Sequence, residues 1–231
     1  MANYYGTPAI VTDGLIFAVD AGNGQSYVSG SSDTFSLVPV TYTGSLINDT
    51  QFEDINQGTW AFDGVGDYID CGTTLGDQLG DNYVGNLSVS LWFKTNGFGD
   101  DGIFSMGLDG SYGKINVAVR SSELKCFFGG GTIIEPFTDT TSWHNVTLVY
   151  TSGSEANCNM YLDNSPVGTK SGGIPPATST MDFAGKKMVI GAYYSIGYPF
   201  NGNIANCQVY NKALTAAEVL QNYNATKGRF I

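Results

Sequence analysis

The sequence predicts an all-β protein, a sandwich of two antiparallel sheets that ends in one short α-helix. Short segments with alternating apolar and polar residues predict many strands. The 31 glycines and the charged share of only 13% suit short strands that are joined by tight turns. Because sandwiches of about this length commonly form one unit, the 231 residues predict one domain over residues 14–231, preceded by an arm over residues 1–13.

Alternation with a period of two residues is clearest in the middle of the chain. In residues 87–94, Val89, Leu91 and Phe93 share one face, which predicts a strand with one buried face. Residues 60–71 contain a D-G-V-G-D turn between two apolar segments and predict a hairpin. Further strands with the same alternation are predicted at 115–120, 144–150 and 158–162.

The two ends of the chain differ in character. Residues 1–13 lack periodicity and contain Pro8, which predicts an extended arm that either hangs free or docks on a neighbouring molecule. Near the other end, Thr215 and Glu218 form a T-x-x-E capping box, the signature of a helix start. One apolar helix face follows and predicts a helix that covers a sheet; its residues are Ala216, Val219, Leu220 and Tyr223.

Several segments resemble a known family. The strand at 204–210 with YNKALTAAEVLQNYNA resembles the C-terminal signature of laminin-G-like domains of the concanavalin A-like lectin/glucanase superfamily. The tail VLQNYNATKGRF is similar to that of structural proteins of tailed bacteriophages, especially cyanophages. The resemblance implies a concanavalin A-like jelly roll from Asp13 onward, but this fold hosts lectins, glucanases, adhesins and scaffolds alike. It is supported, in order, by GLIFAVDAGNGQSY, WAFDGVGDYIDCG, WHNVTLVY and MYLDNSPVG.

Composition argues against several classes of partner. The net charge is −11 and the ten Lys and Arg residues are scattered, so neither nucleic acid nor an anionic lipid surface is expected as a partner. We expect no membrane insertion and no signal peptide, hence synthesis in the host cytoplasm.

The four cysteines are isolated from one another and predict buried thiols rather than a metal or redox centre.

The residues needed for catalysis are not grouped in the sequence. Glucanases of the superfamily carry an E-x-D-x-x-E strand, because retaining hydrolysis needs two carboxyl groups about 5 Å apart. The five glutamates of this chain never approach that spacing. His144 is the only histidine, and its W-H-N-V context resembles a framework position. We therefore predict no enzyme and no catalytic residue, with a glycoside hydrolase as the least favoured alternative.

No cofactor is predicted to be required. A structural calcium ion is the metal that the sequence could support, through Asp63 and Asp67 of the D-G-V-G-D turn. Related domains use an aspartate of the last strand for such a site, where this chain has Ala205. The alternative for Asp63 is closure of its own turn by side-chain to backbone hydrogen bonds.

Aromatic residues give the candidate ligand contacts. Tyr193, Tyr194 and Tyr198 fall in one loop between strands, and Trp92 is predicted on an outward strand face. Tyrosine presents an apolar ring and a hydroxyl together, which suits both sugars and protein interfaces. The alternative is that these rings pack within the sandwich.

Together, these features predict a non-enzymatic virion structural protein of a tailed phage, either a capsid decoration or a head or tail fibre component. Expected partners are capsid, fibre or tail proteins, contacted through residues 1–13, and further copies of the chain in a symmetric oligomer. The alternative is a carbohydrate-binding adhesin, a receptor-binding protein that recognises host surface glycans.

Overall fold

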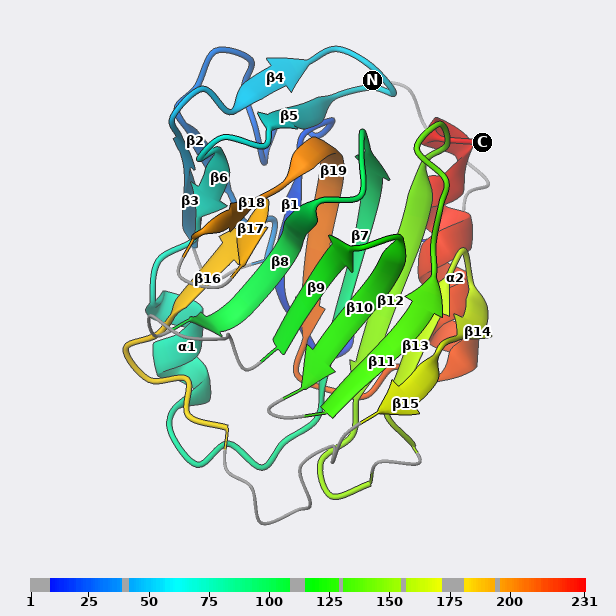
Figure 1. Cartoon of the computed structure of the whole chain (residues 1–231). Helices are drawn as coiled ribbons and strands as arrows, with labels where there is room; N and C mark the ends of the chain where they lie inside the picture. The colour runs from blue at the N-terminus through cyan, green and yellow to red at the C-terminus, as the bar shows by residue number, and fades with distance from the viewer. Residues whose placement is uncertain are drawn as a thin grey trace.

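The computed structural model describes residues 9–38, 42–108, 115–128, 131–154, 157–171, 181–193 and 196–231. Within them the chain forms two large antiparallel sheets that face each other, with α1 (Thr74–Leu79) at one end and α2 (Ala216–Thr226) against one side (Figure 1). A 3₁₀ turn at Lys227–Arg229 follows α2. The arrangement is the jelly-roll sandwich with one short C-terminal helix that the sequence predicts.

Sheet A has eight strands and is centred on β19, which pairs with β7 on one side and with β5 and β1 on the other. Its path is β14-β13-β12-β7-β19-β5-β4, with β1 added beside β19. The bounds are β1 (Leu15–Asp20), β4 (Gln51–Glu53), β5 (Thr59–Asp63), β7 (Leu87–Thr95), β12 (His144–Tyr150), β13 (Asn159–Leu162), β14 (Ser165–Val167) and β19 (Asn201–Tyr210).

Sheet B has nine strands in the order β15-β11-β10-β9-β8-β16-β6-β3-β2. A separate hairpin, β17 (Ala192–Tyr193) with β18 (Tyr198–Pro199), links β16 of sheet B to β19 of sheet A. The bounds in sheet B are β2 (Asp33–Phe35), β3 (Thr43–Ile47), β6 (Tyr68–Asp70), β8 (Asp100–Leu108), β9 (Ile115–Arg120), β10 (Glu123–Phe128), β11 (Gly131–Pro136), β15 (Thr169–Ser171) and β16 (Lys187–Ile190).

The core lies between the two sheets, as the alternation predicts. One continuous buried cluster contains Val89, Leu91 and Phe93 of β7 together with Ile115, Val117 and Val119 of β9. Each large side chain buried there contributes about 1.5–3 kcal/mol to stability. The prediction of a single buried face is wrong for β7, however. Ser90 and Trp92 on its other face are also buried, because α2 and its flanking segments cover sheet A.

The predicted hairpin at residues 60–71 does not form. Its two strands are present as β5 and β6, but β5 lies in sheet A and β6 lies in sheet B. The chain also crosses between the sheets just before this point, in the opposite direction, because β3 is in sheet B and β4 is in sheet A. Asp67 ties the two crossings together, since its carboxylate accepts the N–H of Asp49 at 3.0 Å and that of Asp63 at 3.2 Å.

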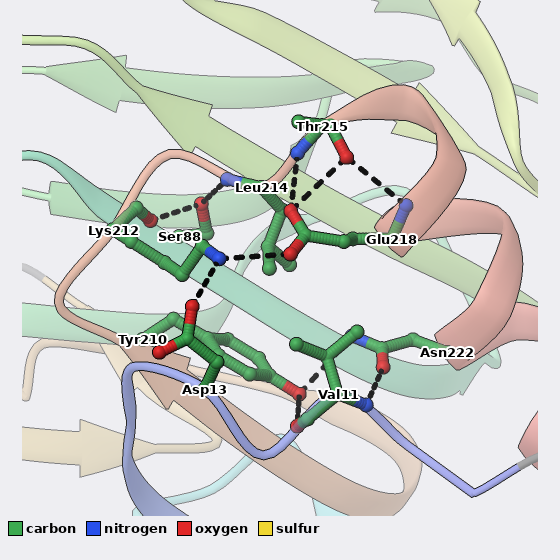
Figure 2. Close-up of polar contacts among 9 residues, drawn as sticks. All are labelled: Val11, Asp13, Ser88, Tyr210, Lys212, Leu214, Thr215, Glu218 and Asn222. Atoms are coloured by element: carbon green, nitrogen blue, oxygen red, sulfur yellow. Dashed lines mark hydrogen bonds and ion pairs between the residues drawn. The ribbon is translucent and has the colours of Figure 1, made fainter.

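Helix α2 begins as predicted, with both hydrogen bonds of the Thr215–Glu218 capping box present (Figure 2). The face that α2 buries differs from the predicted one. Val219 is fully buried, but Leu220 is 43% exposed, and the polar Asn222 is buried instead. The buried face of α2 therefore includes Asn222, whose side chain has hydrogen-bond partners beneath the helix.

Those partners join the N-terminal segment to the last strand and the helix. The N–H of Val11 donates to Asn222 Oδ1 at 2.8 Å, and Asn222 Nδ2 donates to the hydroxyl of Tyr210 at 3.0 Å. Tyr210 in turn donates to the carbonyl of Val11 at 3.2 Å (Figure 2). Residues 9–13 of the predicted arm are therefore fastened to their own domain, whereas residues 1–8 lie outside the described residues.

Replacement of Asn222 tests this junction. Asn222→Leu keeps the branched side-chain shape and the number of heavy atoms but leaves the buried N–H of Val11 without its acceptor, so we expect a loss of about 1–3 kcal/mol in the free energy of unfolding. Gln221→Ala is the matched control, because Gln221 is exposed and its side chain bonds, among the described residues, only the carbonyl of Ala9. Urea denaturation measures both variants. Equal effects of the two changes would contradict the assignment.

Candidate functional site

The β17–β18 hairpin packs directly on the outer face of sheet B. Gly191, with φ of 85°, turns the chain from β16 into the hairpin. At Gly102 of β8 an added Cβ would come within 2.3 Å of the backbone nitrogen of Tyr193, so only glycine permits this approach. The cross-strand neighbour of Gly102 is Ala118 of β9, another small residue. This pair of small residues gives Tyr193 room to lie against the sheet.

Three aromatic rings form a row over strands β8 to β10. Tyr193 stacks on Phe127 of β10 at 6.2 Å between ring centroids and on Tyr198 at 5.1 Å. Tyr193 itself is only 1% exposed, and its two neighbours are half-buried. The buried central ring therefore supports the two outer rings, which present part of their surface to solvent.

Two ion pairs share this outer face of sheet B with the aromatic row. Arg120 Nε lies 2.8 Å from Asp100 Oδ1, and Lys125 Nζ lies 2.6 Å from Glu123 Oε2. The register Ala118↔Lys125 and Arg120↔Glu123 places them on the same side of β9 and β10. We define the hairpin face as Phe127, Tyr193 and Tyr198 together with these two pairs. It combines aromatic surface with charged hydrogen-bonding groups.

The structure separates the four predicted ligand-contact residues. Tyr193 and Tyr198 lie together on the hairpin face, and Tyr194 lies outside the described residues. Trp92 is on the outer face of sheet A, as predicted, but it is 1% exposed. It stacks on Phe230 at 4.3 Å, and its Nε1 donates to Thr226 Oγ1 at 2.8 Å. Trp92 therefore packs beneath the C-terminal segment, which favours the alternative that this ring packs within the protein.

The carboxylates of Asp63 and Asp67, which are predicted to bind calcium, accept hydrogen bonds from backbone N–H groups. Asp67 is 2% exposed and each of its oxygens faces an N–H, while Asp63 Oδ1 accepts the N–H of Val65 at 2.6 Å. Burial raises the pKa of Asp67 above its ordinary value, although the two N–H bonds act in the opposite direction. The described residues contain no group of three or more His, Cys, Asp or Glu that could hold a metal. Asp63 and Asp67 therefore fit turn closure better than calcium.

His144 is held between two carboxylates. Its Nδ1 lies 2.7 Å from Asp163 Oδ2, and its Nε2 lies 3.3 Å from Asp139 Oδ2 without hydrogen-bond alignment. Phe93 and Phe137 pack against the ring. Burial opposes protonation, but Asp163 and then Asp139 outweigh it and raise the pKa of His144. Because Nε2 faces a carboxylate rather than a hydroxyl or thiol, the arrangement is that of a structural ion pair.

A comparison with protein families covers most of the chain. Residues 63–220 match the family described as the concanavalin A-like lectin/glucanases superfamily. The chain belongs to this superfamily. The match includes the hairpin, sheet B from β6 onward and most of sheet A. A sequence search among curated proteins finds no match.

Solved structures of the same fold come from proteins with different roles. Trypanosoma rangeli sialidase in complex with sialic acid is 15% identical, with a TM-score of 0.70 over 96% of this chain and 34% of the sialidase. The receptor binding domain of botulinum neurotoxin D is 14% identical, with a TM-score of 0.68 over 91% of this chain and 52% of that domain. The chain thus spans about a third to a half of these proteins, and the likeness concerns the fold alone.

Five members of the hairpin face, Phe127 and the four ion-paired residues, are not among the predicted ligand contacts. Phe127 lies in K-C-F-F, where either phenylalanine could face the core, and the structure places Phe128 inside and Phe127 outside. Arg120 and Lys125 are separated from the tyrosine loop by about 70 residues of sequence. Alternation in 115–120 and 123–128 places them on the outward faces, but nothing local indicates that the loop folds back over them.

The structural role of His144 predicts a pH dependence. A folded-state pKa above the unfolded value means that the protonated ion pair stabilises fully below about pH 6.5 and that this contribution is lost as the pH rises through the folded-state pKa. We expect the free energy of unfolding of His144→Gln to fall short of that of the parent chain most strongly at acidic pH. A difference that grows between mildly acidic and mildly alkaline pH would contradict the ion pair.

Proposed function

We propose that this chain is a non-enzymatic recognition domain carried on the particle of a tailed bacteriophage, and that its hairpin face binds glycans of the host surface. The observation that carries the glycan part is the supported aromatic row with two ion pairs beside it on the same face of sheet B. Sugar rings stack on aromatic faces through their C–H groups while their hydroxyls need hydrogen-bond partners. Tyr198 and Phe127 offer the first kind of contact, and the Arg120 and Lys125 pairs offer the second.

The rigidity of the support favours binding. Tyr193 is clamped between sheet B and its two aromatic neighbours, so the rings do not have to be ordered when a ligand arrives. Preorganised side chains lose less conformational entropy on binding. The hairpin backbone is fixed by its contact with Gly102. A shallow, preformed surface of this kind suits an extended glycan chain.

The non-enzymatic part of the proposal rests on the hydrogen bonds and ion pairs that the acidic side chains already make. The Asp63 and Asp67 carboxylates accept backbone N–H groups, and His144 lies between Asp139 and Asp163. On the hairpin face, Asp100 and Glu123 are each paired with a cation. Retaining or inverting hydrolysis would need one carboxyl group kept protonated and a second facing it across the bond. The described acidic residues on this face are held as paired carboxylates instead.

The virion part of the proposal rests on the resemblance of the C-terminal tail to structural proteins of tailed phages. In that setting the partners would be capsid, fibre or tail proteins, and copies of the chain would assemble symmetrically. The predicted docking segment, residues 1–13, divides in two. Ala9 and Val11 bond α2 of the same chain, which leaves residues 1–8 as the segment proposed to reach a neighbouring virion protein.

Glycan binding is tested by alanine substitution on the hairpin face. On an array of bacterial surface glycans, Tyr198→Ala and Phe127→Ala should each weaken binding at least about fivefold, because each removes a stacking surface. Phe35→Ala is the control, since Phe35 is an exposed aromatic residue, 41% accessible, on the edge strand β2. Binding that survives both hairpin-face changes, or that Phe35→Ala reduces equally, would exclude this face.

The virion role predicts a place on the particle. Cryo-electron microscopy of purified phage should show the sandwich on the outside, with the hairpin face toward solvent and contacts to a neighbouring protein made near α2, where residue 9 is anchored. Deletion of residues 1–8 should release the protein from the particle. Particles that lack the protein, or attachment that survives the deletion, would contradict the proposed role of the arm.

A further inference from the structure

A pocket lies toward the other end of sheet B, away from the hairpin face. It is a pocket of about 430 Å³ between β3, β6, β16 and the start of α1, the group of elements at the left of Figure 1. This volume is within the range of about 300–1,000 Å³ typical of small-molecule sites. The pocket is lined by Tyr42, Thr43, Ser45, Ile47, Asp70, Cys71, Gly72, Thr74 and Lys187.

An ion pair crosses the wall of the pocket. Lys187 Nζ lies 2.6 Å from Asp70 Oδ2, while Asp70 Oδ1 accepts the N–H of Gly72 at 2.9 Å. The carboxylate is therefore fixed from both sides. The hydrogen bond with Asp70 also raises the pKa of Lys187, so the lysine stays charged. The ammonium group keeps N–H donors that Asp70 does not use, because lysine has three.

Hydroxyl groups line the rest of the pocket. The Thr43 and Thr74 side chains are exposed and have no hydrogen-bond partner among the described residues. Ser45 donates to Asp33 Oδ1 at 2.7 Å, which leaves its oxygen able to accept. The Tyr42 ring is held in place because its hydroxyl donates to Gln78 of α1. The lining of the pocket thus combines hydrogen-bond donors and acceptors with apolar surface from Ile47 and Tyr42.

The charged residues of the pocket, Lys187 and Asp70, determine which class of ligand it suits. An anion would gain little, because Asp70 already neutralises Lys187 and the whole chain carries a net charge of −11. A cation would gain little for the matching reason, since Asp70 is the only acidic residue among the described residues that line the pocket. An apolar ligand would leave the paired charges and hydroxyls without solvent. A neutral molecule with several hydroxyls satisfies every group.

We propose that this pocket binds a neutral polyhydroxylated ligand, a hexose unit without a carboxylate, with Asp70 accepting from one hydroxyl, Lys187 donating to a neighbouring one, and Thr43 and Thr74 completing the ring of contacts. The site differs from the hairpin face in strands, residues and shape. Its occupancy therefore does not depend on the function proposed for that face.

The test is a nuclear magnetic resonance titration of the full chain labelled with ¹⁵N, in a buffer free of glycerol, Tris and sugars. The probes are methyl glycosides of glucose, galactose and mannose, with N-acetylneuraminic acid as the anionic probe. At least one neutral glycoside should shift the N–H signals of Thr43, Ser45 and Gly72, whereas the acid should leave them unchanged. Absence of shifts with every neutral glycoside, or equal shifts with the acid, would overturn the proposal.

Two variants separate recognition from folding. Lys187→Met should raise the Kd of the neutral glycoside about tenfold, and Thr43→Val, which removes an exposed hydroxyl without a protein partner, about threefold. Lys212→Met is the control, because Lys212 is also ion-paired but lies beside α2 against sheet A. Unchanged Kd values for both pocket variants would refute the site. Shifts confined to Phe127 and Tyr198 would support the hairpin face and refute the pocket.

Discussion

Helix α2 and the turn that follows it are fastened to sheet A at both ends, and this attachment determines which surfaces of the sandwich remain open. At the start of the helix, the capping box and Lys212 join Glu218 to Asp13 of the N-terminal segment (Figure 2). At its end, both Asp20 oxygens accept from Arg229 Nη1, at 2.7 and 2.9 Å. The central strands β7, β12 and β19 of sheet A are therefore buried on both faces, whereas the outer side of sheet B keeps half-exposed aromatic and charged side chains that a ligand can reach.

The polar side chains that the sequence offers as candidates for metal binding or catalysis, Asp63, Asp67 and His144, hold the connections between strands. Asp67 joins two segments that cross from one sheet to the other, and a buried carboxylate is stable there because backbone N–H groups satisfy it. His144 joins the beginning of β12 to Asp163, in the turn after β13. Asp67 and His144 are buried or half-buried and have partners already. Solvent-accessible groups that could bond a ligand lie on the outer side of sheet B, at the hairpin face and in the pocket beside Lys187.

Local sequence patterns predicted the parts of the fold that depend on local physics. The alternation in β7, β9 and β12 identified core residues, and T-x-x-E located the first turn of α2, because both patterns record which side of one element is buried. The hairpin at 60–71 was predicted wrongly because a D-G-V-G-D turn looks the same whether the next strand pairs with its predecessor or enters the other sheet. Trp92 was placed on the correct face, but its cover comes from residues more than 130 positions later. The grouping of Phe127 with Tyr193 is set by the hairpin folding back over Gly102, which no local pattern records.

The central claim is that this sandwich recognises ligands on the outer side of sheet B without transforming them. A crystal structure of the chain soaked with a glycan that it binds tests this claim most directly. We predict an intact glycan in contact with Tyr198 and Phe127, and an unchanged α2 over Trp92. A glycan seated against Trp92 after α2 has moved away, or a cleaved product between two facing carboxyl groups, would contradict it.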